Sequence, residues 1–67
     1  MEGKVKSFSP KHGYGFLIGD SDEIFFFHAR EWESRTRPLR GMRVAFTPTV
    51  TEKGMRATNI RRLKDDK

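Results

Sequence analysis

The sequence lacks cysteine altogether, and none of its apolar runs approaches the length of a membrane helix. Without thiols the chain has neither a disulfide nor a thiolate ligand for a metal ion, which fits a reducing compartment. The first residues also lack the apolar stretch that a signal peptide requires. We therefore expect a cytoplasmic protein that does not bind a membrane.

Patterns of catalysis and metal binding are also missing. His12 and His28 have no cysteine and no cluster of carboxylates to complete a metal site. Ile18 stands where a dinucleotide fingerprint would need its third glycine, and no helix is expected after it. No serine lies in a nucleophile motif, and so short a chain has no room for a cleft between domains. We predict no enzyme, no cofactor and no small-molecule substrate.

Length and charge narrow the choice further. The 67 residues allow one domain, which we place at residues 1–64 with a frayed tail at 65–67, and a monomer is the simplest expectation. Fourteen Lys and Arg residues against nine Asp and Glu give a net charge of +5. A surplus of positive charge attracts polyanions over a long range. Nucleic acid is therefore the class of partner that the composition favours.

Helical periodicity is absent, and five segments instead have the alternation or the β-branched composition of strands: 4–8, 14–18, 23–28, 42–50 and 55–63. Turn residues separate most of them, and a long charged connection follows the third. The predicted fold is all-β, a five-stranded antiparallel Greek-key barrel of the oligonucleotide-binding (OB) type. Its expected core includes Val5, Leu17, Val44, Phe46, Ala57 and Ile60.

Two neighbouring predicted strands carry aromatic residues at alternate positions. Tyr14 and Phe16 lie in one strand, and Phe25 and Phe27 lie in the other. Since alternate residues of a strand share a face, we predict that these four rings form one exposed aromatic face. The residues between them would then point into the core: Gly15, Leu17, Ile24 and Phe26. Bases of a single strand suit such a face, because each base can stack on a ring.

Residues 12–17, His-Gly-Tyr-Gly-Phe-Leu, follow the ribonucleoprotein pattern K/R-G-F/Y-G/A-F-V at every position but the first, if Leu is accepted for Val. In this interpretation the glycines let bases approach the backbone and the aromatic residues stack on them. Residues 24–28, Ile-Phe-Phe-Phe-His, supply a second motif. With Gly-Lys-Val-Lys at 3–6 and Ala-Thr-Asn-Ile at 57–60, the sequence resembles the cold-shock domain family over nearly its whole length.

The resemblance implies a barrel that holds single-stranded RNA or DNA and acts as an RNA chaperone or as a regulator of transcription or translation. Carried over by position, the nucleic-acid contacts would be Lys6, His12, Tyr14, Phe16, Phe25, Phe27, His28 and Lys53. The sequence departs from the family at Ser7, where Trp is common, so one stacking platform is missing. It departs again where the second motif ends Phe27-His28 instead of His-Phe.

Several alternatives stay open at this point. A similar barrel serves structured RNA of the ribosome or of translation initiation, and an aromatic face can also dock a peptide. The arginines between Arg30 and Arg43 fit a solvated loop, although some of them suit phosphate contacts. Trp32 either packs against the barrel or leans over the binding face. Phe8 suits the core, or support at the edge of the bases, better than direct stacking.

Overall fold

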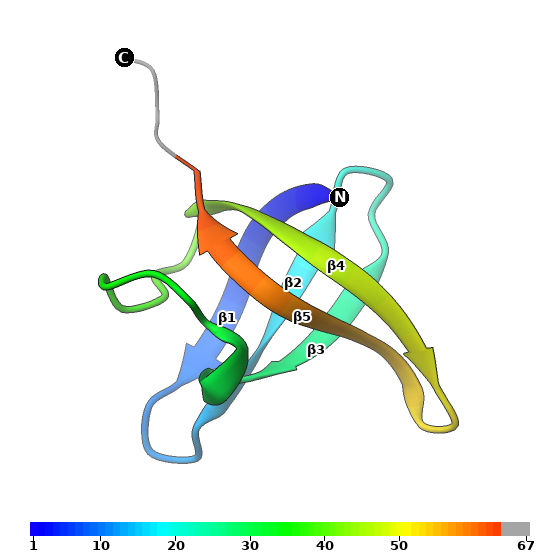
Figure 1. The fold of residues 1–67 in the computed structure, drawn as a ribbon, viewed down its shortest axis with the longest axis horizontal. Coiled ribbons are helices and arrows are strands. Elements are labelled where there is room, and N and C mark those ends of the chain that lie inside the picture. The colour runs from blue at the N-terminus through cyan, green and yellow to red at the C-terminus, as the bar shows by residue number, and fades with distance from the viewer. Residues whose placement is uncertain (64–67) are drawn as a thin grey trace.

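Five strands and one short 3-10 helix make up the computed structural model, which describes residues 1–63 (Figure 1). The elements are β1 (Glu2–Ser9), β2 (Tyr14–Gly19), β3 (Ile24–His28), η1 (Ala29–Glu31), β4 (Arg43–Thr51) and β5 (Gly54–Arg62). The strands close into a barrel in the order β1-β2-β3-β5-β4. The predicted five-stranded Greek-key barrel is confirmed, whereas the predicted tail at 65–67 lies outside the described residues.

Antiparallel pairing holds most of the barrel together, since β1 pairs with β2 and β4, β2 with β3, and β4 with β5. The barrel closes through a parallel contact in which Phe26 of β3 lies opposite Arg56 of β5. The register shifts in β1 between Val5 and Ser7, so Lys6 occupies a bulge. This bulge changes the alternation of side chains along the strand, and both Lys6 and Ser7 are exposed.

The core consists of inward side chains from all five strands. Six of the core residues expected from the sequence are buried: Val5, Leu17, Val44, Phe46, Ala57 and Ile60. Two further rings join them, because Phe25 and Phe27 are both 0% exposed. The Phe25 ring lies 4.9 Å from that of Phe46, and the Phe27 ring stacks at 5.7 Å on Phe8. Phe8 therefore supports the core, as its sequence position indicated.

The prediction that Phe25 and Phe27 are exposed, with Ile24 and Phe26 inside, was wrong. The β2–β3 hairpin pairs Phe16 with Phe26, and Gly15 with Phe27. Cross-strand partners share a face, so Phe26 lies beside Phe16 on the outside while Phe27 lies beside inward-facing Gly15. The side chains of β2, by contrast, were assigned to the correct faces of the sheet. A shift of one residue reverses every side chain of a strand, and this is the error made for β3.

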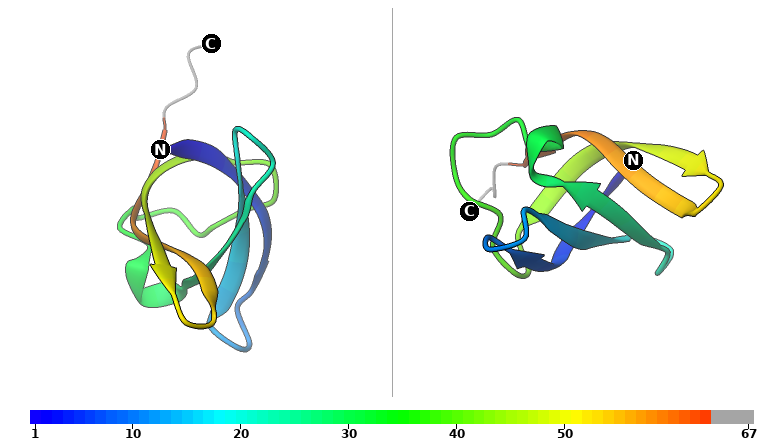
Figure 2. Two further views of the ribbon diagram at one scale, coloured as in Figure 1. Left: turned by 90° about the vertical axis from the view of Figure 1, so that its right-hand side faces the viewer. Right: turned by 90° about the horizontal axis from the view of Figure 1, so that it is seen from below.

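The connection between η1 and β4 is fastened to the barrel at both ends, while its middle loops outward from the strands (Figures 1 and 2). The Glu33 amide donates to the Ile60 carbonyl at 2.7 Å, and the Arg62 amide donates to Ser34 Oγ at 2.8 Å. Trp32 packs against the core near Phe27, with 6.4 Å between the ring centroids. The packing alternative for this residue is the one observed.

Among residues 1–63, no helix has both the length and the apolar composition needed to cross a bilayer.

Candidate nucleic-acid interface

Three aromatic rings and a histidine form an outward surface on β2 and β3, which we call the aromatic face: Tyr14, Phe16, Phe26 and His28. Tyr14 lies opposite His28 in the hairpin, and Phe16 lies opposite Phe26. Tyr14 is 38% exposed, and the other three residues are half-buried. The core on the other side of the hairpin is already filled by Leu17 and its neighbours, so the aromatic face is not needed to close it.

Three rings of the aromatic face, those of Tyr14, Phe16 and Phe26, lie in contact with one another and form a triangle. The centroid of Tyr14 lies 5.5 Å from that of Phe26 and 6.4 Å from that of Phe16, and Phe16 lies 5.8 Å from Phe26. The Arg56 guanidinium carbon lies 5.3 Å from the centre of the Phe26 ring, within the range of a cation–π contact. A positive charge is thus fixed beside a ring on which a base can stack. This combination suits a base together with its phosphate.

Hydrogen bonds orient both histidines near Tyr14. The Arg30 amide donates to His28 Nδ1 at 3.2 Å, so His28 caps the first turn of η1. A ring whose Nδ1 accepts a hydrogen bond carries its proton on Nε2 when it is neutral. His12 shares a hydrogen bond of 2.9 Å with the Ser9 hydroxyl, and its ring lies 5.7 Å from Tyr14. Both imidazoles therefore extend the aromatic face at the Tyr14 end.

Gly15 has a structural role that differs from the one predicted. It is buried and faces inward, so it does not provide an approach for bases. A Cβ atom built at this position would lie 2.3 Å from the Ser7 carbonyl oxygen and 3.0 Å from the Phe27 ring. Gly15 is required because β2 approaches β1 and the core too closely for any side chain.

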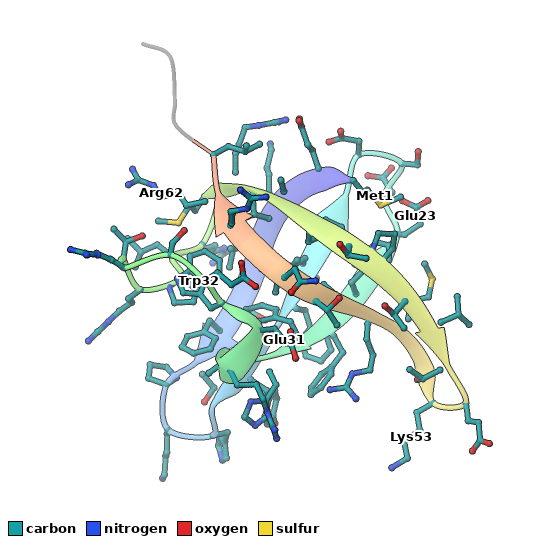
Figure 3. All side chains as sticks on the ribbon, viewed as in Figure 1. Met1, Glu23, Glu31, Trp32, Lys53 and Arg62 are labelled. Carbon is teal, nitrogen blue, oxygen red and sulfur yellow. The ribbon has the colours of Figure 1, made fainter. Side chains whose placement is uncertain are left out.

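The two predicted lysine contacts lie on different borders of the aromatic face. Lys53 lies at the tip of the β4–β5 hairpin, where Figure 3 labels it. There it lines a hollow of about 430 Å³ together with Phe16, Phe26 and Arg56. Lys6, by contrast, lies in the bulge of β1, next to Ser7, which pairs with Phe16. Lys53 therefore lies beside the rings of Phe16 and Phe26, whereas Lys6 lies one residue from the strand position that pairs with Phe16.

Two residues of the aromatic face and its rim were missed by the sequence analysis, and they were missed for different reasons. The outward position of Phe26 follows from the turn of the hairpin. The Gly19 amide donates to the Glu23 carbonyl, and counting away from this pair along both strands places Phe26 opposite Phe16. Arg56 had no local signal, because only the parallel contact between β3 and β5 brings it to Phe26. The predicted contacts at Phe25 and Phe27 are not available on the surface, since both rings are buried.

Comparison with known proteins agrees with this geometry. A family model described as the 'Cold-shock' DNA-binding domain matches residues 1–63. The chain belongs to the cold-shock domain family. Solved structures agree, with 46 matching chains. One of them, Drosophila Unr CSD456, is 27% identical with a TM-score of 0.72, and the match covers 94% of this chain. No curated protein sequence matches the chain.

The match covers only 26% of the Unr structure, so this cold-shock domain spans about a quarter of that chain's length. Membership of the family identifies the domain as a nucleic-acid-binding module. At Ser7 this cold-shock domain has an exposed hydroxyl opposite Phe16. The aromatic face therefore ends at β2 instead of continuing onto β1.

Proposed function

We propose that this cold-shock domain binds single-stranded RNA or DNA by stacking bases on the aromatic face, and that it acts as an RNA chaperone or as a regulator of transcription or translation. The observation that carries the proposal is the triangle formed by Tyr14, Phe16 and Phe26, on the outside of a barrel whose core is complete without them. The three ring centroids lie 5.5 to 6.4 Å apart, so adjacent bases of one strand reach them together.

A comparison of energies supports the proposed chaperone activity. Stacking of a base on an aromatic side chain contributes about 1–3 kcal/mol. A stem of three base-pair steps is held by roughly 4 kcal/mol of stacking. Two or three stacked bases therefore match the stability of a weak hairpin, and the domain shifts such a hairpin toward its open form by binding it. Binding supplies the energy, so no nucleotide hydrolysis is needed.

The test is a titration of fluorescently labelled oligonucleotides, followed by anisotropy. We expect an unstructured pyrimidine strand to bind more tightly than a stable hairpin or a duplex of the same length. A weak hairpin that carries a fluorophore and a quencher should open as the protein is added, without ATP. Preference for the stable hairpin would indicate a structured-RNA binder, and no binding of any oligonucleotide would favour a peptide-binding barrel.

Salt dependence tests the phosphate contacts that we propose for four exposed lysines: Lys4, Lys6, Lys11 and Lys53. If about four phosphates are neutralised on a single strand, the logarithm of the association constant should fall against the logarithm of salt concentration with a slope near −3. A flat response would contradict the assignment of these lysines. The aromatic contacts would then carry the affinity alone.

A further inference from the structure

A second group of cations lies beside β1, outside the aromatic face. The end of the connection to β4 is rich in arginine and contains no acidic residue between positions 35 and 43. The side chains of Arg37, Arg40 and Arg43 are all exposed. Arg62, at the end of β5, lies at the opposite end of that strand from Lys53 (Figure 3). Positive charge is therefore concentrated on a side of the barrel that the proposed stacking does not use.

The turn that carries Arg40 is fixed to β1. The Gly41 amide donates to the Val5 carbonyl, and the Val5 amide donates to the Met42 carbonyl, both at 2.9 Å. Gly41 has a φ of +85°, which glycine adopts without strain. Pro38, just before the turn, is buried. Because its backbone is hydrogen-bonded to β1, the turn holds the Arg40 backbone beside this strand, and the Arg40 side chain is exposed.

Two hollows meet at this arginine. One, of about 370 Å³, is lined by Lys6, Arg37 and Arg40 and begins at Ser7, the cross-strand partner of Phe16. The other, of about 490 Å³, continues from Arg40 along the start of β4 and the end of β5. Among residues 1–63, no acidic residue lines either hollow. We call the cations that line them the cationic track: Lys4, Lys6, Arg37, Arg40, Arg43 and Arg62.

The track differs chemically from the aromatic face. Among the described residues that line the two hollows, Phe8 is the only aromatic one, and its ring stacks on buried Phe27. The planar guanidinium groups of arginine bind phosphate oxygens in pairs, and they carry no information about bases. Glu2 bonds Arg43 at 3.2 Å, but an exposed pair of this kind is weak and competes poorly with phosphates. The track is therefore suited to a nucleic-acid backbone rather than to bases.

We propose that a single strand held on the aromatic face continues across β1 at Ser7 and along the cationic track, which binds its phosphates without regard to sequence. The proposal rests on the proposed function. It makes the binding site longer than the stacking rings require. It also assigns a role to Ser7: the strand passes over a small side chain there, from stacked bases to bound phosphates.

The test compares two double variants that lose the same charge. Arg37→Ala/Arg40→Ala removes the middle of the track, and the matched control Arg35→Ala/Arg61→Ala removes two exposed arginines that line neither hollow. Each variant is titrated with oligothymidylates of about six and about ten nucleotides, within the range of site sizes of such barrels. Urea unfolding of both variants checks that they remain folded. A longer strand offers more positions at which the protein can bind, which raises the apparent affinity of every variant alike. Comparing the variants on strands of equal length removes this effect.

We expect the track variant to bind the longer strand roughly tenfold more weakly than the wild type does, and to bind the shorter strand within about twofold. Its salt slope on the longer strand should fall by about 1.4, because two phosphate contacts are lost. The control should change both affinities little. Equal losses for the two variants, or unchanged binding of the longer strand by the track variant, would overturn the inference and leave the track to an acidic protein or to no partner. Failure of the wild type to bind either strand would instead overturn the proposed function.

Discussion

Replacing Phe26 and Phe27 separately tests the assignment of faces, because these adjacent residues point to opposite sides of β3. Phe26 lies on the aromatic face, between Tyr14 and Arg56, whereas Phe27 is fully buried. Phe26→Ala removes one stacking platform worth about 1–3 kcal/mol, so the dissociation constant should rise about 5- to 150-fold. Phe27→Ala leaves a cavity between Phe8 and Trp32 and should cost about 3–5 kcal/mol of folding stability.

That cost is large for this domain. At about 0.05–0.15 kcal/mol per residue, a chain of this size has roughly 3–10 kcal/mol of stability. Phe27→Ala should therefore unfold at much lower urea concentration, or be largely unfolded in buffer, as followed by circular dichroism and Trp32 fluorescence. Phe26→Ala should lose affinity in the anisotropy titration while its unfolding midpoint changes little. A stable Phe27→Ala protein with a specific loss of binding, or a Phe26→Ala protein with unchanged affinity, would refute the assignment.

Two further substitutions test the neighbouring positions. Ser7→Trp should tighten the binding of a pyrimidine strand by about 5- to 150-fold, because a ring at this exposed position would extend the aromatic face beyond Phe16 onto β1. Unchanged or weaker binding in the same titration would show that the strand does not reach β1. Gly15→Ala should lower the free energy of unfolding by about 1–3 kcal/mol or more, because the new methyl group would overlap the Ser7 carbonyl. A urea unfolding midpoint equal to that of the wild type would argue against this tight approach of β1 and β2.

Most of the barrel could be predicted from local patterns. Alternation placed Val5, Leu17 and Val44 in the core, and turn residues separated the strands correctly. The orientation of β3 could not be obtained from alternation, because residues 24–27 are all apolar and both faces look alike. Tertiary pairing decides it: Phe26 faces outward because Phe16, its partner across the hairpin, does.

Other parts of the candidate site depend on contacts between segments distant in sequence. Arg56 joins the aromatic face through the closure of the barrel between β3 and β5, which no single segment encodes. The arginine-rich connection lacked periodicity, so a solvated loop was the natural interpretation. Its arginines are exposed, as that interpretation requires, and hydrogen bonds to Val5 on one side and Ile60 on the other fasten its two ends to the barrel.

The most direct test of the central claim is an NMR titration of the labelled protein with a single-stranded pyrimidine oligonucleotide of about seven nucleotides. Stacking on the aromatic face predicts the largest shifts in the ring resonances of Tyr14, Phe16, Phe26 and His28, with upfield movement from the ring currents of the bases. Shifts confined to β4 and the far side of β5, or a spectrum unchanged at saturating oligonucleotide, would contradict the account.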